Sequence, residues 1–125
     1  MIKQVIVVRK DLNCRRGKWM AQSAHASMAV LLQSINLEEG THTLHQNPSI
    51  KEWLQGRFTK IVVSVDSEEE LLLIHQKALE AGIPCSLIQD CGATEFHGVP
   101  TYTCCAIGPD EEEKIDLITR GLKLL

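Results

Sequence analysis

A chain of 125 residues and 14.0 kDa is long enough to bury a hydrophobic core, and its length predicts a single domain over residues 1–125. Hydrophobic residues make up 44% of the sequence and charged residues 23%, as in a soluble globular protein, and no stretch approaches the roughly 18 consecutive apolar residues that a membrane helix needs. The net charge of −3 excludes a protein that coats polyanions with its whole surface.

The first predicted elements are a strand and an amphipathic helix. The continuous β-branched run KQVIVVR at residues 3–9 predicts a strand that is covered on both faces. The N-terminus lacks the small-residue cleavage site of a signal peptide, so we expect a cytoplasmic protein. After a loop over residues 11–17, apolar residues recur at three- and four-residue steps from Lys18 to about Ile35, which predicts a helix.

The middle of the chain holds two predicted helices around a second strand. Residues 36–48 are polar and predict a loop. The helix expected over residues 49–56 has Ser49 as its N-cap with a glutamate three residues later, as in a capping box. KIVVSV at residues 60–65 predicts a strand, and residues 66–82 predict a helix with acidic residues in its first turn and a glycine at its end.

Two strands and a helix complete the chain. PCSLIQD at residues 84–90 and TYTCCAIG at residues 101–108 predict strands, and Pro109 begins a helix expected over residues 109–122. The order β-α-α-β-α-β-β-α predicts an α/β fold, a three-layer α/β/α sandwich with a four-stranded sheet and a largely parallel core. The 10-residue loop over residues 91–100 allows the fourth strand to return antiparallel, which makes the sheet mixed.

The cysteines indicate neither disulfides nor a metal site. They are odd in number and include no C-x-x-C pair: Cys14, Cys85, Cys91, Cys104 and Cys105. Cys104 and Cys105 are neighbours on a predicted strand and therefore point to opposite faces, which suits neither a disulfide nor a tetrahedral zinc site. We expect reduced, mostly buried cysteines.

Cations gather at the start of the first helix. Residues 1–18 hold six basic residues against one acidic residue, a charge of +5 that leaves −8 on residues 19–125. The positive end of the helix dipole disfavours the cations Arg15, Arg16 and Lys18 at this place. The cluster therefore favours a bound anion, which would also accept hydrogen bonds from the free backbone N–H groups of the first helical turn. The pattern predicts a phosphate-binding face, and an ordinary solvated surface is the alternative.

Polar side chains are expected to converge near this helix start. Steps of four and three place Lys18, Gln22 and His25 along one stripe of the helix. This stripe borders the face that we expect to pack on the sheet, which is formed by Ala21, Met28 and Leu32. Asp90 is the last residue of the third predicted strand, and Thr94 lies four residues further on. If the first and third strands are parallel neighbours, Asp90 opens onto the end of the sheet where this helix begins. The alternatives are a half-buried structural histidine for His25 and a turn residue for Asp90.

Three stretches carry a resemblance to a known family: GKWMAQSAHASM, DSEEELLLIHQKALEAGIPCSLIQDCGATEF, and PTYTCCAIGP with the terminal LKLL. On these motifs the chain resembles the second type of peptidyl-tRNA hydrolase, which is typical of archaea and eukaryotes and also found in some bacteria. The resemblance implies a three-layer α/β/α domain with a four-stranded mixed sheet. It also implies hydrolysis of the ester between a peptide or N-blocked amino acid and the 3′-terminal ribose of tRNA. No metal or organic cofactor is implied, and many members are homodimers.

The resemblance also implies catalytic residues, which are Lys18, Asp90, Thr94 and Thr103. On this basis we expect Asp90 to orient and partly deprotonate a water, directly or through Thr94. Lys18 is expected to stabilise developing negative charge or to hold the terminal phosphate, and Thr103 to hold the acyl or ribose end by hydrogen bonding.

The expected contacts to the acceptor stem and 3′ end of peptidyl-tRNA are Arg15, Arg16, Gln22 and His25, of which Gln22 and His25 match positions that line the family's cleft. The family often has basic residues where this chain has Gln89 and Ala93. We therefore expect phosphate binding to depend more on the two arginines.

Two other functions stay open. A cysteine-nucleophile hydrolase would use Cys14 or Cys91 with His25 or His97, since a thiol near arginines and a helix start can have a depressed pKa. A non-catalytic module on the same fold would bind tRNA or a protein partner without turnover.

Overall fold

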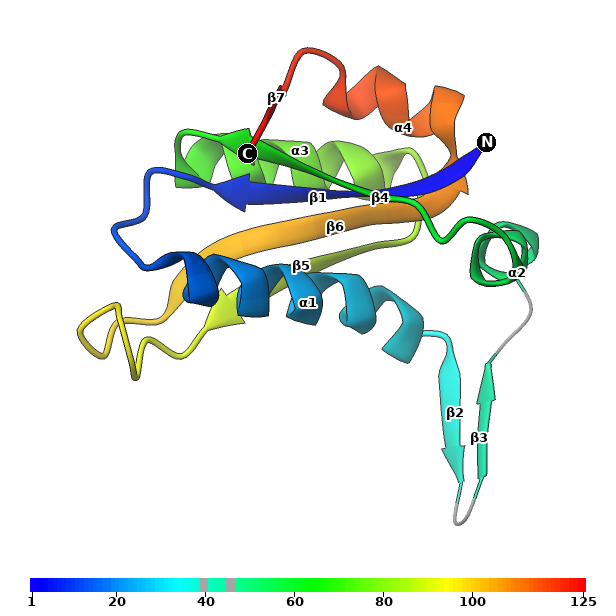
Figure 1. The fold of residues 1–125 in the computed structure, drawn as a ribbon, viewed down its shortest axis with the longest axis horizontal. Coiled ribbons are helices and arrows are strands. Elements are labelled where there is room, and N and C mark those ends of the chain that lie inside the picture. Colours follow the sequence, from blue (N-terminus) through cyan, green and yellow to red (C-terminus); the bar gives the residue numbers. More distant parts are fainter. Residues whose placement is uncertain (39–40, 45–46) are drawn as a thin grey trace.

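The computed structural model describes residues 1–38, 41–44 and 47–125. Its elements are β1 (Ile2–Arg9), α1 (Arg16–Leu32), β2 (Ile35–Glu38), β3 (Thr41–Leu44), α2 (Pro48–Gln55), β4 (Lys60–Val65), α3 (Glu68–Glu80), β5 (Cys85–Asp90), β6 (Thr101–Glu111), α4 (Glu112–Thr119) and β7 (Lys123–Leu124). Helices cover both faces of the central sheet, with α1 on one face and α3 and α4 on the other (Figure 1).

The central sheet is mixed and has five strands in the order β5-β6-β1-β4-β7, where the sequence predicted four. β1 and β4 are parallel, whereas β1 with β6, β5 with β6, and β4 with β7 are antiparallel. The prediction of a largely parallel core is therefore wrong, because β6 returns antiparallel and inserts between β1 and β5. The fifth strand, β7, covers part of the β4 edge and is too short to give a periodic signal in the sequence.

Helix α1 packs on the sheet with a different face from the one predicted. Its buried residues are Gln22, Ala26 and Val30. Ala21, Met28 and Leu32 are exposed. The prediction failed because the buried face holds a hydrogen-bonded glutamine and a small alanine, so apolar periodicity does not mark it. The helix also ends at Leu32, before the predicted Ile35.

The segment predicted as a loop over residues 36–48 contains a β-hairpin. β2 and β3 pair antiparallel and extend away from the central sheet (Figure 1). Residues 39–40 and 45–46 of the predicted loop lie outside the described residues. The N-cap of α2 is Asn47 and not Ser49, because the Asn47 side chain accepts hydrogen bonds from the backbone N–H groups of Ser49 and Ile50 and a proline follows it.

Pro109 lies in a strand and does not begin the last helix. β6 continues to Glu111, and α4 starts at Glu112. The pairing of β1 with β6 shifts its register between Lys3 and Val5, which is opposite this part of β6. A proline is tolerated at such an irregularity because no regular ladder hydrogen bond is needed there.

The core consists of two clusters, one on each face of the sheet. Cys105 belongs to the cluster under α3 and α4, and Cys104 to the cluster under α1, so the prediction that they point to opposite faces is confirmed. All five cysteines lie in the described residues and are free. No helix among the described residues has the length and apolar character needed to cross a membrane.

Candidate active site

The site lies where β1 and β5 end. Both strands are antiparallel to β6, which lies between them, so they run in the same direction although they are not neighbours. Their carboxyl ends therefore meet at one edge of the sheet. The start of α1 follows β1 there, and the loop over residues 91–100 follows β5.

Lys18 joins the two segments. Its Nζ donates to Asp90 Oδ1 at 2.9 Å and to Thr94 Oγ1 at 3.0 Å. The side chains of Lys18 and Asp90 are only 15% and 12% exposed, so this ion pair is largely shielded from solvent. The predicted convergence of these three residues is thus observed.

Asp90 is held through both of its carboxylate oxygens. Oδ1 also accepts from Gln22 Nε2 at 3.2 Å, and Oδ2 accepts from the backbone N–H of Gly92 at 2.9 Å. The hydrogen bond from Lys18 is the main cause that lowers the pKa of Asp90, and it outweighs the opposing effect of desolvation. Asp90 is therefore an ionised, fixed carboxylate.

Gln22 and Thr103 form the buried side of the site. Thr103 Oγ1 donates to Gln22 Oε1 at 2.6 Å, which turns the amide so that Nε2 faces Asp90. Both side chains are buried against the sheet. Thr103 thus acts on Asp90 through Gln22 and lies behind the surface that a ligand would touch.

The loop after Asp90 is tightly folded. The backbone N–H of Gly98 donates to the carbonyl oxygen of Gly92 at 2.8 Å. Gly92 has φ of +84°, and a Cβ there would lie 2.2 Å from the carbonyl oxygen of Val99. Only glycine fits this close backbone approach, which explains the spacing of the D-x-G-x-T motif.

Glu95 belongs to the site and was missed by the sequence analysis. Its carboxylate accepts from Arg15 Nε at 2.7 Å and from the Arg15 backbone N–H at 2.9 Å. These bonds from Arg15 lower the pKa of Glu95. The first turn of α1 contains no acidic residue. This was the signal in the sequence that the acceptor for the free N–H groups at the helix start comes from elsewhere in the chain.

An open hollow of about 510 Å³ lies beside this cluster. Its lining residues are Arg15, Gly17, Lys18, Ala21, Thr94 and Glu95. The ring of Phe96 lies near the ammonium group of Lys18, whose Nζ is 5.6 Å from the ring centroid. The hollow gives a ligand access to the Lys18 ammonium and the Thr94 hydroxyl.

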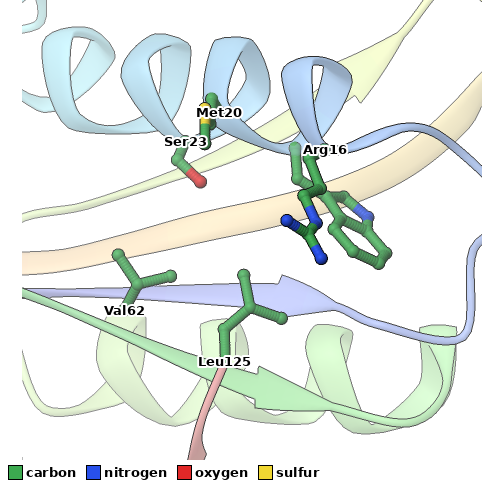
Figure 2. A pocket seen from close by; sticks show the side chains of 6 residues that line it. Arg16, Met20, Ser23, Val62 and Leu125 are labelled. Atoms are coloured by element: carbon green, nitrogen blue, oxygen red, sulfur yellow. The ribbon is translucent and has the colours of Figure 1, made fainter.

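Two predicted residues lie apart from the cluster. Arg16 faces the other side of α1, where it borders an apolar hollow of about 610 Å³ (Figure 2). The other lining residues of this apolar hollow are Trp19, Met20, Ser23, Val62 and Leu125. His25 is exposed on α1, one turn beyond Gln22. Among the described residues, neither Arg16 nor His25 is hydrogen-bonded to the Lys18–Asp90 pair.

The structure gives no support to a thiolate nucleophile at Cys14. Burial and the neighbouring carboxylate of Glu95 raise the pKa of the Cys14 thiol, whereas a nucleophilic thiolate needs a depressed pKa. Within the described ranges, no group of three or more histidine, cysteine, aspartate or glutamate residues is arranged to hold a metal ion.

Comparison with known proteins identifies similar chains over the full length. The family described as "Peptidyl-tRNA hydrolase PTH2" matches residues 2–125. A peptidyl-tRNA hydrolase of Methanocaldococcus jannaschii is 42% identical over 125 residues, with 99% of this chain and 100% of the relative covered. The peptidyl-tRNA hydrolase of Methanopyrus kandleri is 43% identical, with 100% and 99% covered.

A solved structure shares the fold. It is a protein of unknown function from Agrobacterium tumefaciens strain C58, with a TM-score of 0.61 and 19% sequence identity. The alignment covers 98% of this chain and 96% of that chain. At this identity the likeness concerns the fold alone.

Proposed function

The chain belongs to the PTH2 family of peptidyl-tRNA hydrolases, and from this premise we propose that Lys18, Asp90 and Thr94 carry out the hydrolysis of peptidyl-tRNA. The bond that breaks is the ester between the peptide, or an N-blocked amino acid, and the 3′-terminal ribose. The observation that carries the proposal is the Lys18 ammonium, held between the carboxylate of Asp90 and the hydroxyl of Thr94 at the edge of a hollow.

An ester needs moderate assistance to react with water. The site must place a water against the carbonyl carbon, stabilise the oxyanion, and let the ribose oxygen leave as a hydroxyl. The lowered pKa of Asp90 makes it a weak base, so its main role is to orient the water and to hold Lys18 in place.

The hydroxyl of Thr94 helps to place the water. Its oxygen accepts from Lys18, which leaves its own proton free to donate towards the hollow. The water oxygen attacks the carbonyl carbon and passes one proton to the Asp90 carboxylate, directly or through the Thr94 hydroxyl, while Lys18 stabilises the negative charge on the carbonyl oxygen. The C–O bond to the ribose then breaks, and the proton held by Asp90 passes to the ribose oxygen, which leaves as a hydroxyl.

The remaining predicted residues act around this centre. Thr103 and Gln22 are positioning residues, because their hydrogen bonds set the orientation of the Asp90 carboxylate. The exposed guanidinium of Arg15 contacts phosphates of the acceptor stem, independently of sequence. Arg16 and His25 contact the substrate outside the reacting centre.

The setting of the protein follows from its substrate. Peptidyl-tRNA is a product of translation, so we place the protein in the cytoplasm. A homodimer is implied by the family resemblance, and light scattering after size-exclusion chromatography tests it.

The decisive experiment measures release of a labelled N-acetyl-aminoacyl group from tRNA by the purified protein in the presence of EDTA. We expect multiple turnovers, insensitive to iodoacetamide, and a loss of at least about 100-fold in kcat/KM in Asp90→Asn. If neither protein turns over while tRNA still binds, the chain is a binding module, and Gln89 and Ala93 become the positions to restore. Inhibition by EDTA would contradict a reaction that needs no metal.

A further inference from the structure

A single side chain attaches the β5–β6 loop to the N-cap of α1. Glu95 Oε2 accepts the backbone N–H of Arg15 at 2.9 Å, and Oε1 accepts Arg15 Nε at 2.7 Å. Arg15 is the N-cap residue of α1 and makes no side-chain cap of its own. Glu95 therefore supplies, from 80 positions along the chain, the acceptor that a capping-box glutamate supplies locally.

The residues on either side of Glu95 contact Lys18. Thr94 accepts a hydrogen bond from Lys18 Nζ at 3.0 Å, and the Phe96 ring lies 5.6 Å from the same nitrogen. Because Thr94 and Glu95 are adjacent in the chain, the contact of Glu95 with the helix start restrains the backbone that carries the Thr94 hydroxyl.

Among the described residues, the hydrogen bonds of the loop other than those of Thr94 and Glu95 do not reach α1. Gly92 donates to Asp90, and Gly98 donates to Gly92, so these bonds close the loop on itself. The polar contacts between the loop and α1 described above are those made by Thr94 and Glu95. Of these two residues, only Glu95 is held by a backbone N–H group, that of the N-cap residue Arg15.

The exposed fractions of the Glu95 and Arg15 side chains indicate which of their two hydrogen bonds attaches the loop to the helix start. The Glu95 side chain is 14% exposed, whereas that of Arg15 is 90% exposed. A solvent-exposed guanidinium adds little to an ion pair. A shielded carboxylate at a helix N-terminus, by contrast, is stabilised both by the dipole and by the N–H group that it accepts. The backbone contact is thus the attachment, and the guanidinium stays open towards solvent.

We propose that Glu95 is a positioning residue for the hydrolysis of peptidyl-tRNA, which holds Thr94 against Lys18 by accepting the Arg15 N–H. The inference rests on the proposed function and adds a residue to it. Glu95 does not touch the reacting atoms. It keeps the Thr94 hydroxyl, which places the water, at hydrogen-bonding distance from the Lys18 ammonium. Small displacements of such groups lower the rate of the reaction.

The test compares Glu95→Ala with Glu95→Gln in the full chain. Alanine removes the acceptor, so we expect kcat to fall about tenfold while KM stays within about twofold, because every cation that can meet phosphate is retained. Glutamine keeps an amide oxygen for the Arg15 N–H, and we expect it to restore kcat to within about threefold of the unmodified protein. A merely structural role would not produce this separation of kcat from KM.

The control variant is Glu113→Ala, which removes an exposed glutamate of α4. It should leave both constants unchanged, and thermal unfolding should show that Glu95→Ala remains folded. The inference is overturned if Glu95→Ala keeps its kcat, if only KM changes, or if glutamine is as impaired as alanine. Absence of turnover in the unmodified protein would overturn the proposed function itself, which is a different result.

Discussion

Two carboxylates form ion pairs with cations at the start of α1, one from the end of β5 and one from the loop over residues 91–100. Asp90 pairs with Lys18, and Glu95 pairs with Arg15. Of the six basic residues in the first 18, five form ion pairs: Lys3, Arg9, Lys10, Arg15 and Lys18. The predicted phosphate-binding face is thus largely compensated within the molecule. Among the described residues Arg16 alone of the six has no ion pair, and we propose that phosphates contact it and the open side of Arg15.

The ionised carboxylates give the stability a defined dependence on pH. Hydrogen bonds from Lys18 and Arg15 lower the pKa of Asp90 and Glu95 below their usual values. Such a group stabilises the fold above its unfolded pKa, about 4, and this contribution is lost as the pH falls through the lower folded pKa.

We therefore expect the free energy of unfolding to decrease as the pH falls below about 5, and to decrease less steeply in Asp90→Asn. Urea unfolding between pH 3 and pH 7 measures both slopes. Parallel curves for the two proteins would show that the Asp90 carboxylate is not stabilised in the folded state.

At the scale of elements, caps were harder to place than helices. The helix over residues 66–82 was correctly predicted, and its observed core is α3 (Glu68–Glu80) with Ser67 as N-cap. For α2 the capping-box pattern favoured Ser49, but Asn47 supplies the observed cap. The two candidates lie two residues apart, and the hydrogen bonds that the Asn47 side chain accepts, with a proline next in the chain, assign the cap to Asn47.

This difference can be measured by mutation. Asn47→Ala should lower the free energy of unfolding by about 1 kcal/mol, because the backbone N–H groups of Ser49 and Ile50 lose their acceptor. Ser49→Ala should have a smaller effect, since the Ser49 hydroxyl makes only a 3.5 Å contact with Asp110. An equal or larger loss in Ser49→Ala would contradict the assignment of the cap.

At the scale of the whole molecule, the central strands β1 and β6 each contribute residues to both core clusters. Val5 and Val7 of β1 belong to the cluster under α3 and α4, whereas Ile6 and Val8 belong to the cluster under α1. Neither layer can therefore unfold without exposing strands on which the other depends.

For this reason we propose that residues 1–125 fold as a single domain and unfold in one transition. Circular dichroism at 222 nm and tryptophan fluorescence should give coincident urea curves, since Trp19 lies in α1 and Trp53 in α2. Two separated transitions would show that one layer, or the hairpin with α2, is an independent unit.

The sequence by itself determined the local features of this protein. β-branched runs, acidic first turns and terminal glycines report on nearby residues, so the strand at 60–65 was predicted with its observed bounds and the strands beginning near residues 3 and 101 were close. The motifs also sufficed to bring Lys18, Asp90 and Thr94 into one hypothesis.

Only the tertiary structure decided how these parts meet. The insertion of β6 between β1 and β5, the pairing of β7 with β4 and the face that α1 buries depend on contacts between residues far apart in the chain. The attachment of Glu95 to Arg15 and the burial of Thr103 behind Gln22 depend on them too. Local propensity carries no information about such partners, because their energy arises only once the sheet has brought them together.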